Sequence, residues 1–190
     1  FIGGRIATAL AERGYGVTGF GRRPGGWSHP LGTYEQWDVA HGPHSASFDA
    51  VVHSAALADD WAPRAQAMLT NQLGTRHVAA SFAGARIVHI STASVYDAFT
   101  PTVKVRESAP PATRFLSSYP ESKVAAEAEL EGLDAVILRP HAVYGPGDTT
   151  LLPRVMAGIR GRRLALPSGA AVSHTLTHVD NLVDAVVLSL

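Results

Sequence analysis

Short apolar runs alternate along this chain with segments whose apolar residues recur at helical spacing. Each run ends at small or polar residues, which is typical of a buried strand. The expected strands cover residues 17–20, 50–53, 87–91 and 135–138, and a further short strand is expected to end near residue 37. The expected helices cover residues 6–13, 64–82, 152–159 and 181–190, with another around residues 119–123. This alternation predicts βαβ units and an α/β fold with a doubly wound parallel sheet.

The composition narrows the classes of function. The chain has 190 residues, of which 46% are hydrophobic, so one folded domain with a sizeable core is expected. Its net charge is zero, which gives no electrostatic footprint for nucleic acid. It has no cysteine, and its nine histidines include no H-E-x-x-H pattern, so no metal site is expected. No apolar run reaches ~18 residues, so no membrane span is expected, and a cytoplasmic protein is the default interpretation.

The residues that follow each predicted strand are the first candidates for a site. In a doubly wound sheet, ligands bind outside the carboxyl ends of the strands. Small and polar residues gather there, as the floor for a flat cofactor requires. They are Gly21-Arg22-Arg23, Ser54-Ala55-Ala56, Thr92-Ala93-Ser94 and Arg139-Pro140-His141.

Three further features favour a dinucleotide at these strand ends. Phe1-Ile2-Gly3 opens a helix, whose free N–H groups suit a pyrophosphate, although an ordinary helix start is the alternative. Arg22 and Arg23 stand where an acid would bind ribose hydroxyls, and arginine suits a 2′-phosphate. They favour NADP(H) and leave NAD(H) open; a solvated pair in a turn is the alternative. Asp38 can accept a hydrogen bond from an adenine amino group, or it can cap a turn.

Tyr119 and Lys123 lie four residues apart, on one face of the expected helix. A phenol ionises near pH ~10, and a nearby ammonium is expected to lower that pKa. The pair can then exchange a proton with an alcohol or a ketone. Thr92 can hold the oxygen of that substrate, and Ser94, His141 and His174 are candidate substrate contacts. A structural role is the alternative for His141.

The motifs occur together in an order that resembles the extended short-chain dehydrogenases/reductases, the NAD-dependent epimerase/dehydratase superfamily. The resemblance covers nearly the whole chain. It is carried by Phe1-Ile2-Gly3, Asp38-Val39, the segment 52–56, the N-x-x-G-T at 71–75, Thr92, Tyr119, Lys123, the L-R-P-x-x-V-Y-G-P-G at 138–147 and the segment 178–181.

The resemblance implies a Rossmann-type fold and a role for each matched residue. Tyr119 exchanges the proton, Thr92 holds the reacting oxygen, and Lys123 holds the nicotinamide ribose and lowers the pKa of Tyr119. The implied cofactor-binding residues are Phe1, Ile2, Gly3, Arg22, Arg23, Asp38, Val39, Ser54, Ala55, Ala56, Asn71, Tyr119, Lys123, Pro140 and Val143. Family members often form dimers, so a homodimer is an expected arrangement.

Two departures count against a nucleotide-sugar substrate. Epimerases of the superfamily usually carry Asn where this chain has Ala142, and Arg where it has His174. Arginine grips a phosphate bidentately, which histidine cannot do. The segment 144–154 looks more like the 3β-hydroxysteroid dehydrogenase-like branch, which implies an apolar alcohol or ketone.

The resemblance also divides the chain. Residues 1–145 are expected to form the NAD(P)-binding Rossmann domain with its first strand missing. Residues 146–190 are expected to begin a substrate-binding part, mostly missing here, and to return a helix to the first domain. The predicted function is an NAD(P)-dependent oxidoreductase that interconverts an alcohol and a ketone. A nucleotide-sugar epimerase or dehydratase with tightly bound NAD, and a non-catalytic NADP(H)-binding sensor, are the alternatives.

Overall fold

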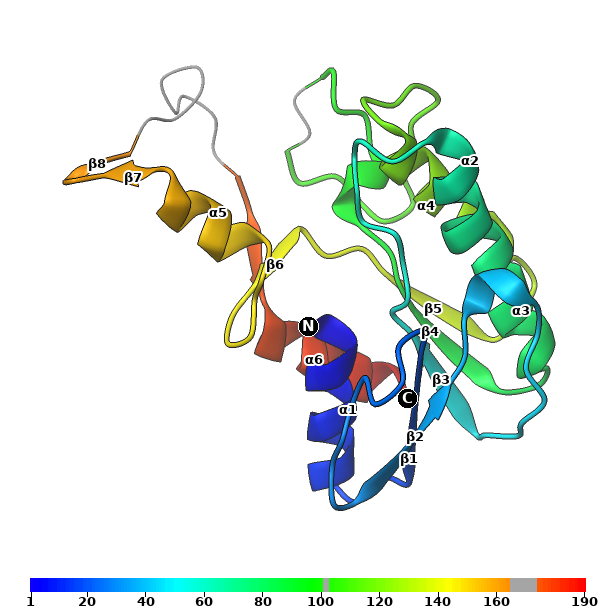
Figure 1. Ribbon diagram of the computed structural model, residues 1–190. Coiled ribbons are helices and arrows are strands. Elements are labelled where there is room, and N and C mark those ends of the chain that lie inside the picture. Colours follow the sequence, from blue (N-terminus) through cyan, green and yellow to red (C-terminus); the bar gives the residue numbers. More distant parts are fainter. Residues whose placement is uncertain (101–102, 165–173) are drawn as a thin grey trace.

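The computed structural model describes residues 1–100, 103–164 and 174–190, and Figure 1 shows their arrangement. The helices are α1 (Ile2–Glu12), α2 (Arg64–Ala67), α3 (Gly74–Ser81), α4 (Ser118–Ala128), α5 (Leu151–Ala157) and α6 (Val179–Ser189), with short turns at Val39–His41, Met68–Leu73 and Ala93–Val95. The strands are β1 (Val17–Gly21), β2 (Gly32–Gln36), β3 (Ala50–His53), β4 (Arg86–Ile90), β5 (Ala135–Leu138), β6 (Ala142–Tyr144), β7 (Ile159–Arg160), β8 (Arg163–Leu164) and β9 (Leu176–His178).

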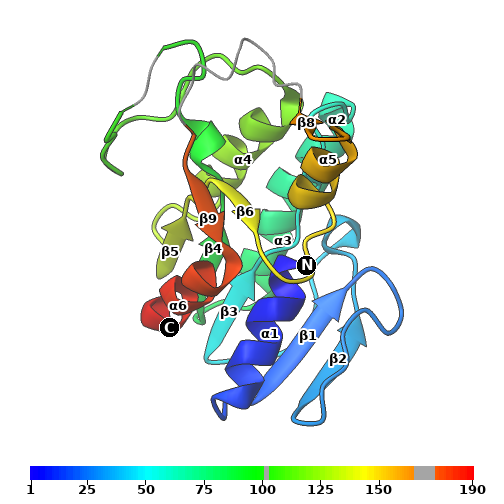
Figure 2. The same ribbon diagram turned by 90° about the vertical axis from the view of Figure 1, so that its left-hand side faces the viewer.

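The predicted parallel α/β architecture is confirmed. β1 pairs with β2, and β3, β4 and β5 form a second parallel sheet in that order. Helices α1 and α6 cover one face, while α3 and α4 cover the other (Figures 1 and 2). The carboxyl ends of all five strands therefore point to the same edge, which is where the predicted site residues lie.

The two sheets are not paired with each other in the described part of the chain. β1 bonds only to β2, and β3 only to β4, so each leaves an edge of backbone N–H and C=O groups unpaired. A cavity of about 1010 Å³ is lined by both edges. A strand–helix–strand unit places its two parallel strands in one sheet. A strand before α1 would fit between these edges, and the expected first strand stays a prediction.

Two clusters of apolar side chains hold the helices to the strands. On one face, Val88 and Ile90 of β4 pack against α1 and against Leu182 and Val186 of α6. On the other face, Phe82 packs with the aromatic rings of Phe20, Trp37 and Phe48. Burying each such side chain contributes about 1.5–3 kcal/mol. Because neighbouring residues of a strand face opposite ways, His89 between Val88 and Ile90 is turned toward α4.

The predicted helix over 64–82 is present but interrupted. Its middle, Met68–Leu73, widens into one π-helical turn between α2 and α3. Such insertions are frequent at functional sites. Here the turn carries Asn71, which is 1% exposed and reaches across to α4.

Helix α4 also begins as predicted, one residue before Tyr119. Pro120 lies in its first turn, where the backbone N–H groups have no intrahelical acceptor and a proline costs little. The helix therefore presents Tyr119 at its amino end, beside the carboxyl end of β4.

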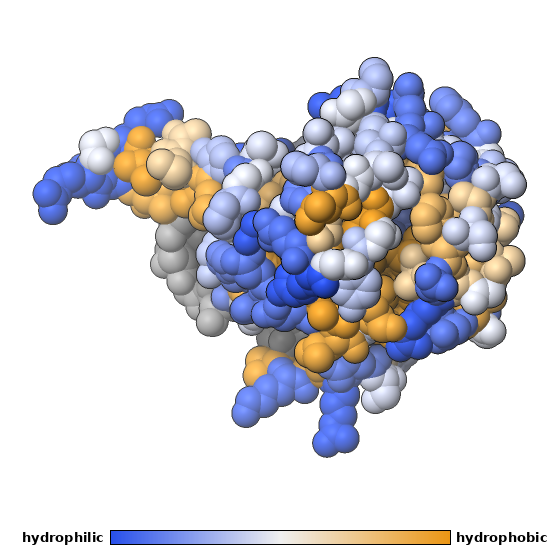
Figure 3. Space-filling model, turned by 90° about the horizontal axis from the view of Figure 1, so that it is seen from below, coloured by the Kyte–Doolittle hydropathy of each residue, from blue (hydrophilic) through white to orange (hydrophobic). Residues whose placement is uncertain are grey.

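The last part of the described chain contains short strands that the sequence patterns did not predict. β6 pairs in parallel with β9, and β7 pairs with β8. Strands of two or three residues are too short for periodicity to reveal. Helix α5 and strands β7 and β8 project from the body (Figure 1), and Figure 3 shows hydrophobic residues on this projection. Among them, Val155, Met156 and Ile159 are exposed.

The longest helices, α1, α4 and α6, each have 11 residues. A membrane-crossing helix needs about 20 apolar residues. Within residues 1–100, 103–164 and 174–190, no helix has the length and apolarity for such a crossing.

Candidate active site

Tyr119 and Thr92 meet where the first turn of α4 passes the end of β4. Thr92 directly follows β4 and caps the short turn behind it, with its Oγ1 accepting from the backbone N–H of Ser94 at 3.1 Å. Its hydroxyl donates to Ser94 Oγ at 3.2 Å, and it lies near enough to the Tyr119 phenol to lower the pKa of that phenol. The structure thus brings together two of the three predicted catalytic residues.

The net pKa of Tyr119 is nevertheless raised above its usual value of 10. Burial is the main cause, because a phenolate would lose its hydration there, and the negative charge of Asp60 adds to it. The expectation of a pKa lowered by Lys123 is wrong for this arrangement. Tyr119 is therefore a neutral phenol at neutral pH, ready to donate a proton.

Lys123 points into the protein interior. It is 1% exposed, and its Nζ donates to the carbonyl oxygen of Ile90 at 2.8 Å and to His89 Nε2 at 2.9 Å. Burial lowers the pKa of the ammonium to about 8, and the carboxylate of Glu127 opposes this shift. The contacts to β4 explain why Lys123 does not lower the pKa of Tyr119 here. Its expected contact with a ribose stays a prediction.

Asn71 ties the loop after β3 to the start of α4. Its side-chain amide accepts from the Leu57 N–H at 2.7 Å and donates to the Leu57 carbonyl at 3.1 Å and to Ser122 Oγ at 2.8 Å. Ser122 in turn donates to the backbone carbonyl of Tyr119. Asn71 thus fixes the turn that carries the phenol, and its expected contact with the cofactor stays a prediction.

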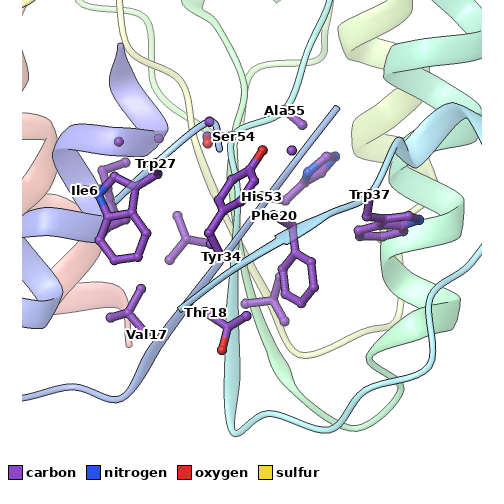
Figure 4. A pocket seen from close by; sticks show the side chains of 18 of the residues that line it. Ile6, Val17, Thr18, Phe20, Trp27, Tyr34, Trp37, His53, Ser54 and Ala55 are labelled. Carbon is purple, nitrogen blue, oxygen red and sulfur yellow. The ribbon is translucent and has the colours of Figure 1, made fainter. Parts of the chain in front are cut away.

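The larger cavity is the one between the two sheets, and Figure 4 shows part of its lining. Its outer end lies at the carboxyl ends of the strands, and nine of the predicted cofactor-binding residues line it. They are Phe1, Gly3, Arg22, Arg23, Asp38, Val39, Ser54, Ala55 and Ala56. The other six do not line it: Ile2, Asn71, Tyr119, Lys123, Pro140 and Val143. Its inner end is apolar and includes Ile6, Val17 and Val51.

The residues at the outer end fit a dinucleotide. A Cβ on Gly3 would lie 2.6 Å from Ser54 Oγ, so the backbone of α1 approaches the end of β3 more closely than a larger residue allows. Phe1 makes no side-chain cap, which leaves the first N–H groups of α1 free for an anion. Ser54, Ala55 and Ala56 add only small side chains to the floor.

Arg22 and Arg23 lie on a loop whose backbone is fixed. The Tyr34 hydroxyl donates to the Arg23 carbonyl at 2.6 Å, and the Gln36 amide donates to the Arg22 carbonyl at 2.9 Å. Both arginines are exposed, and neither forms an ion pair with a described residue. Asp38 caps the turn after it by accepting from the Ala40 N–H at 3.0 Å, as the alternative interpretation predicted. Its contact with adenine stays a prediction.

A second cavity of about 750 Å³ opens beside the start of α4, where Ser117 and Pro120 line it. All three predicted substrate residues line it: Ser94, His141 and His174. Ala93 and Pro120, the chain neighbours of Thr92 and Tyr119, also line it. The rest of its wall includes the large apolar side chains of Trp61, Phe115, Leu116, Leu151 and Leu176 and the charged side chains of Asp60, Asp97 and Arg114. Trp61 is 94% and Leu116 70% exposed, which suits a surface that an apolar ligand covers.

Sequence reasoning missed several residues of this region. Asp60 and Trp61 line the second cavity from the loop after β3, where the chain leaves the predicted strand end. Glu127 lies one turn after Lys123 and forms a two-pronged ion pair with Arg139, with the shortest contact at 2.6 Å. His89 lies within the strand that was predicted at residues 87–91 from its apolar side chains, and it was not singled out. A charged or polar residue inside a buried element was the signal in the last two cases.

A metal centre finds no support in the described part of the chain. Within residues 1–100, 103–164 and 174–190, no group of three or more histidines and carboxylates is placed to hold an ion.

Known proteins similar to this chain include reductases and a dehydrogenase. The chain is 31% identical to a 4-hydroxy-2-methyl-3-oxo-4-farnesyl-3,4-dihydroquinoline-1-oxide ketoreductase of Stigmatella aurantiaca, over 100% of this chain and 61% of the relative. It is 33% identical to a 2-alkyl-3-oxoalkanoate reductase of Shewanella oneidensis, over 100% of this chain and 54% of the relative. A 3-beta-hydroxysteroid dehydrogenase of Mycolicibacterium neoaurum is 28% identical, over 100% and 58%. The chain thus spans between about half and three fifths of the length of these relatives.

Solved structures share the fold. The NAD+ complex of the Bordetella bronchiseptica enzyme WbmH superposes with a TM-score of 0.78 at 30% identity, covering 99% of this chain and 68% of that one. The NAD-dependent NDP-hexosamine 5,6-dehydratase TunA gives a TM-score of 0.80 at 26% identity, covering 98% and 67%. A family model also matches residues 1–190 from end to end. The chain is therefore a member of the NAD-dependent epimerase/dehydratase family, with a Rossmann-like fold.

Proposed function

We propose that the protein is an NADP(H)-preferring oxidoreductase that interconverts an alcohol and a ketone. One observation carries the proposal. Tyr119 is a half-buried, neutral phenol near the Thr92 hydroxyl, and a chain neighbour of each residue, Pro120 and Ala93, lines the second cavity. One cavity fits a dinucleotide, and the other is mainly apolar.

In the proposed reaction, the oxygen of the substrate lies between Thr92 and Tyr119. During ketone reduction, Tyr119 donates its proton to that oxygen, and during alcohol oxidation the phenolate takes it back. Thr92 donates a hydrogen bond to the oxygen where negative charge develops. The nicotinamide, when bound, supplies or removes the hydride. Lys123, one helical turn from Tyr119, would hold the ribose of the nicotinamide through its ammonium group, which has only hydrogen-bond donors.

The proposed substrate class is an apolar alcohol or ketone. Trp61, Phe115 and Leu116 give the second cavity a surface that such a molecule would cover. Ala142 and His174 lack the amide and guanidinium groups that grip a sugar nucleotide. Two of the relatives are named as reductases of oxo compounds, which supports this class.

A second candidate is epimerisation or dehydration, in which the cofactor is recycled. The likeness to the dehydratase TunA favours it. A panel of apolar ketones and alcohols with NADPH and NADP+ separates the two. Net change at the nicotinamide absorbance band supports the oxidoreductase. Conversion of a nucleotide sugar without net absorbance change would replace it with the alternative.

The first prediction concerns cofactor choice. We expect NADPH to bind more tightly than NADH, and Arg22→Ala with Arg23→Ala to remove most of that preference. Each charged hydrogen bond to a 2′-phosphate is worth about 1.5–3 kcal/mol, so the expected loss for NADPH is about tenfold or more. Quenching of tryptophan fluorescence gives both dissociation constants. Arg76→Ala is the control, because it removes an exposed arginine that pairs with Glu129. Tighter binding of NADH than of NADPH by the unaltered protein would refute the assignment.

The second prediction concerns pH. Asp60 raises the pKa of Tyr119 through its negative charge, so Asp60→Asn should lower that pKa. Ketone reduction needs the protonated phenol and is lost as pH rises through this pKa. Alcohol oxidation needs the phenolate and appears over the same range. Both limbs of the pH–rate profile should therefore move to lower pH in Asp60→Asn.

The neighbour Asp59 provides a matched control. Asp59→Asn removes the same charge one residue away, from a carboxylate that accepts from the Trp61 N–H. Ser117→Ala removes the hydroxyl that donates to Asp60 at 2.6 Å but keeps the Asp60 charge. Limbs that move equally in Asp59→Asn and Asp60→Asn would show a general surface-charge effect instead.

A further inference from the structure

Lys123 is held by His89, a residue of β4 that the proposed reaction does not use. The Lys123 Nζ lies 2.9 Å from His89 Nε2 and 2.8 Å from the Ile90 carbonyl oxygen. His89 is 0% and Lys123 1% exposed. The contact is therefore shielded from bulk water, where hydrogen bonds and charges interact more strongly than at the surface.

The contact fixes the protonation of His89. An ammonium group has only donors, so His89 Nε2 accepts and the ring carries its proton on Nδ1. Burial, and then the charge of Lys123, lower the pKa of His89 well below 6.5 and keep its ring neutral. The ring can therefore serve as an acceptor for Lys123 at neutral pH.

The neighbouring ring, His53, is fixed in the opposite tautomer. His53 pairs with His89 in the register of β3 and β4, and the ring centroids lie 5.0 Å apart. His53 Nε2 is 3.0 Å from Thr75 Oγ1, whose own hydroxyl donates to the Asn71 carbonyl. His53 Nε2 must therefore donate. Burial lowers the pKa of His53 to about 3, so it adds no charge beside His89.

The buried position of His89 leaves one of its ring nitrogens without a hydrogen-bond partner among the described residues. Its Nδ1 is buried and has no hydrogen-bond partner among the described residues. A buried polar atom without a partner is destabilising, so an apolar side chain would be easier to accommodate here. What an apolar side chain cannot supply is the Nε2 acceptor that Lys123 uses.

We propose that His89 is a positioning residue for Lys123. The neutral ring of His89 holds the Lys123 ammonium below the end of β4 and keeps it charged, one turn from Tyr119. The proposal rests on the proposed function, in which that ammonium holds the nicotinamide ribose. The other ionisable groups around Lys123 are Tyr119 and Glu127 on α4 and His53 on β3, and Arg139 on the loop after β5 is bound to Glu127. None of them replaces the Nε2 acceptor.

The chain is well suited to a direct test, because it contains only two lysines, Lys104 and Lys123. Labelling lysine with ¹³C at Cε gives two signals in an NMR titration, and Lys104→Arg assigns them. Lys104 is exposed and serves as an internal reference. In the unaltered protein, the Lys123 signal should titrate near pH 8, the pKa that burial gives it.

Three substitutions at one position test the acceptor. In His89→Leu, the midpoint of Lys123 should fall by about one pH unit, the size expected when one hydrogen bond to a charged group is lost. His89→Gln can place its Oε1 near the position of Nε2 and should recover most of this shift. His89→Asn is polar but shorter, should behave like His89→Leu, and serves in its place if that variant does not fold.

Val88→Ala is the matched control for lost packing in β4. Its side chain lies on the opposite face, in the cluster with α1 and α6, so the Lys123 midpoint should not move. An unmoved midpoint in both His89→Leu and His89→Asn would overturn the proposal, as would a His89→Gln midpoint equal to that of His89→Leu. The titration needs neither cofactor nor substrate. Absence of nicotinamide turnover would therefore count against the proposed function alone.

Discussion

Replacing Tyr119 with phenylalanine should reduce the turnover of ketone reduction by two or more orders of magnitude. General acid–base catalysis contributes typically about 10²–10⁴-fold, and this substitution removes the only atom proposed to exchange the proton. Phenylalanine keeps the ring that is buried at the start of α4, so the fold should survive. The measurement is kcat with saturating ketone and NADPH in the Tyr119→Phe variant.

Two comparisons separate lost chemistry from lost structure. The dissociation constant for NADPH should change little in Tyr119→Phe, because the phenol does not line the dinucleotide cavity. Tyr144→Phe removes a hydroxyl from β6, where the ring packs edge-on against His178, and should keep its turnover. Thr92→Val should lower kcat less than Tyr119→Phe, since it removes a hydrogen bond and leaves the proton donor. Unchanged turnover in Tyr119→Phe would remove the basis of the proposed reaction.

Sequence reasoning located two strands best. β3 and β5 were predicted to the residue, because the apolar runs at 50–52 and 135–138 are followed directly by the polar residues His53 and Arg139. β2 reads Gly-Thr-Tyr-Glu-Gln and has no apolar run, so its end near residue 37 was predicted but its start was not. The boundaries of β6 and β9 depend on pairing between segments more than 30 residues apart, which no local pattern reports.

In the candidate site, too, some features could be predicted from the sequence and others could not. The positions of Thr92 and Tyr119 followed from strand ends and helix starts, which the sequence specifies locally. The direction of the Lys123 side chain did not, because it depends on an acceptor contributed by β4 from 34 residues away. The pKa of Tyr119 was mispredicted for a related reason. Motif spacing showed a nearby lysine, but burial and Asp60 depend on how the whole site is enclosed.

The second large effect is on stability. Glu127 and Arg139 join α4 to the end of β5 through two hydrogen bonds, of 2.6 and 3.1 Å, and the side chains are 8% and 18% exposed. Ser91 at the end of β4 also donates to Glu127. Glu127→Gln removes the charge that Arg139 faces. We expect it to lower the free energy of unfolding by about 3 kcal/mol or more, because breaking a buried pair leaves the other charge uncompensated.

The expected change in melting temperature is large enough to measure by circular dichroism. For a chain of this size, 1 kcal/mol corresponds to about 2–4 °C, so Glu127→Gln should melt roughly 6–12 °C lower. Glu121→Gln is the matched control on the same helix. Glu121 binds Arg64 through equally short contacts, down to 2.7 Å, but the Arg64 side chain is 66% exposed, so its loss should be much smaller.

A double substitution decides whether the uncompensated charge is the cause. Arg139→Met with Glu127→Gln removes both charges, and its melting temperature should lie above the value expected if the two single losses added. Strict additivity would mean that the pair contributes through packing alone. In that case the three elements that carry Tyr119, Thr92 and the Arg139-Pro140 turn would be held together by apolar contacts. The ion pair would then have no special part in keeping the site assembled.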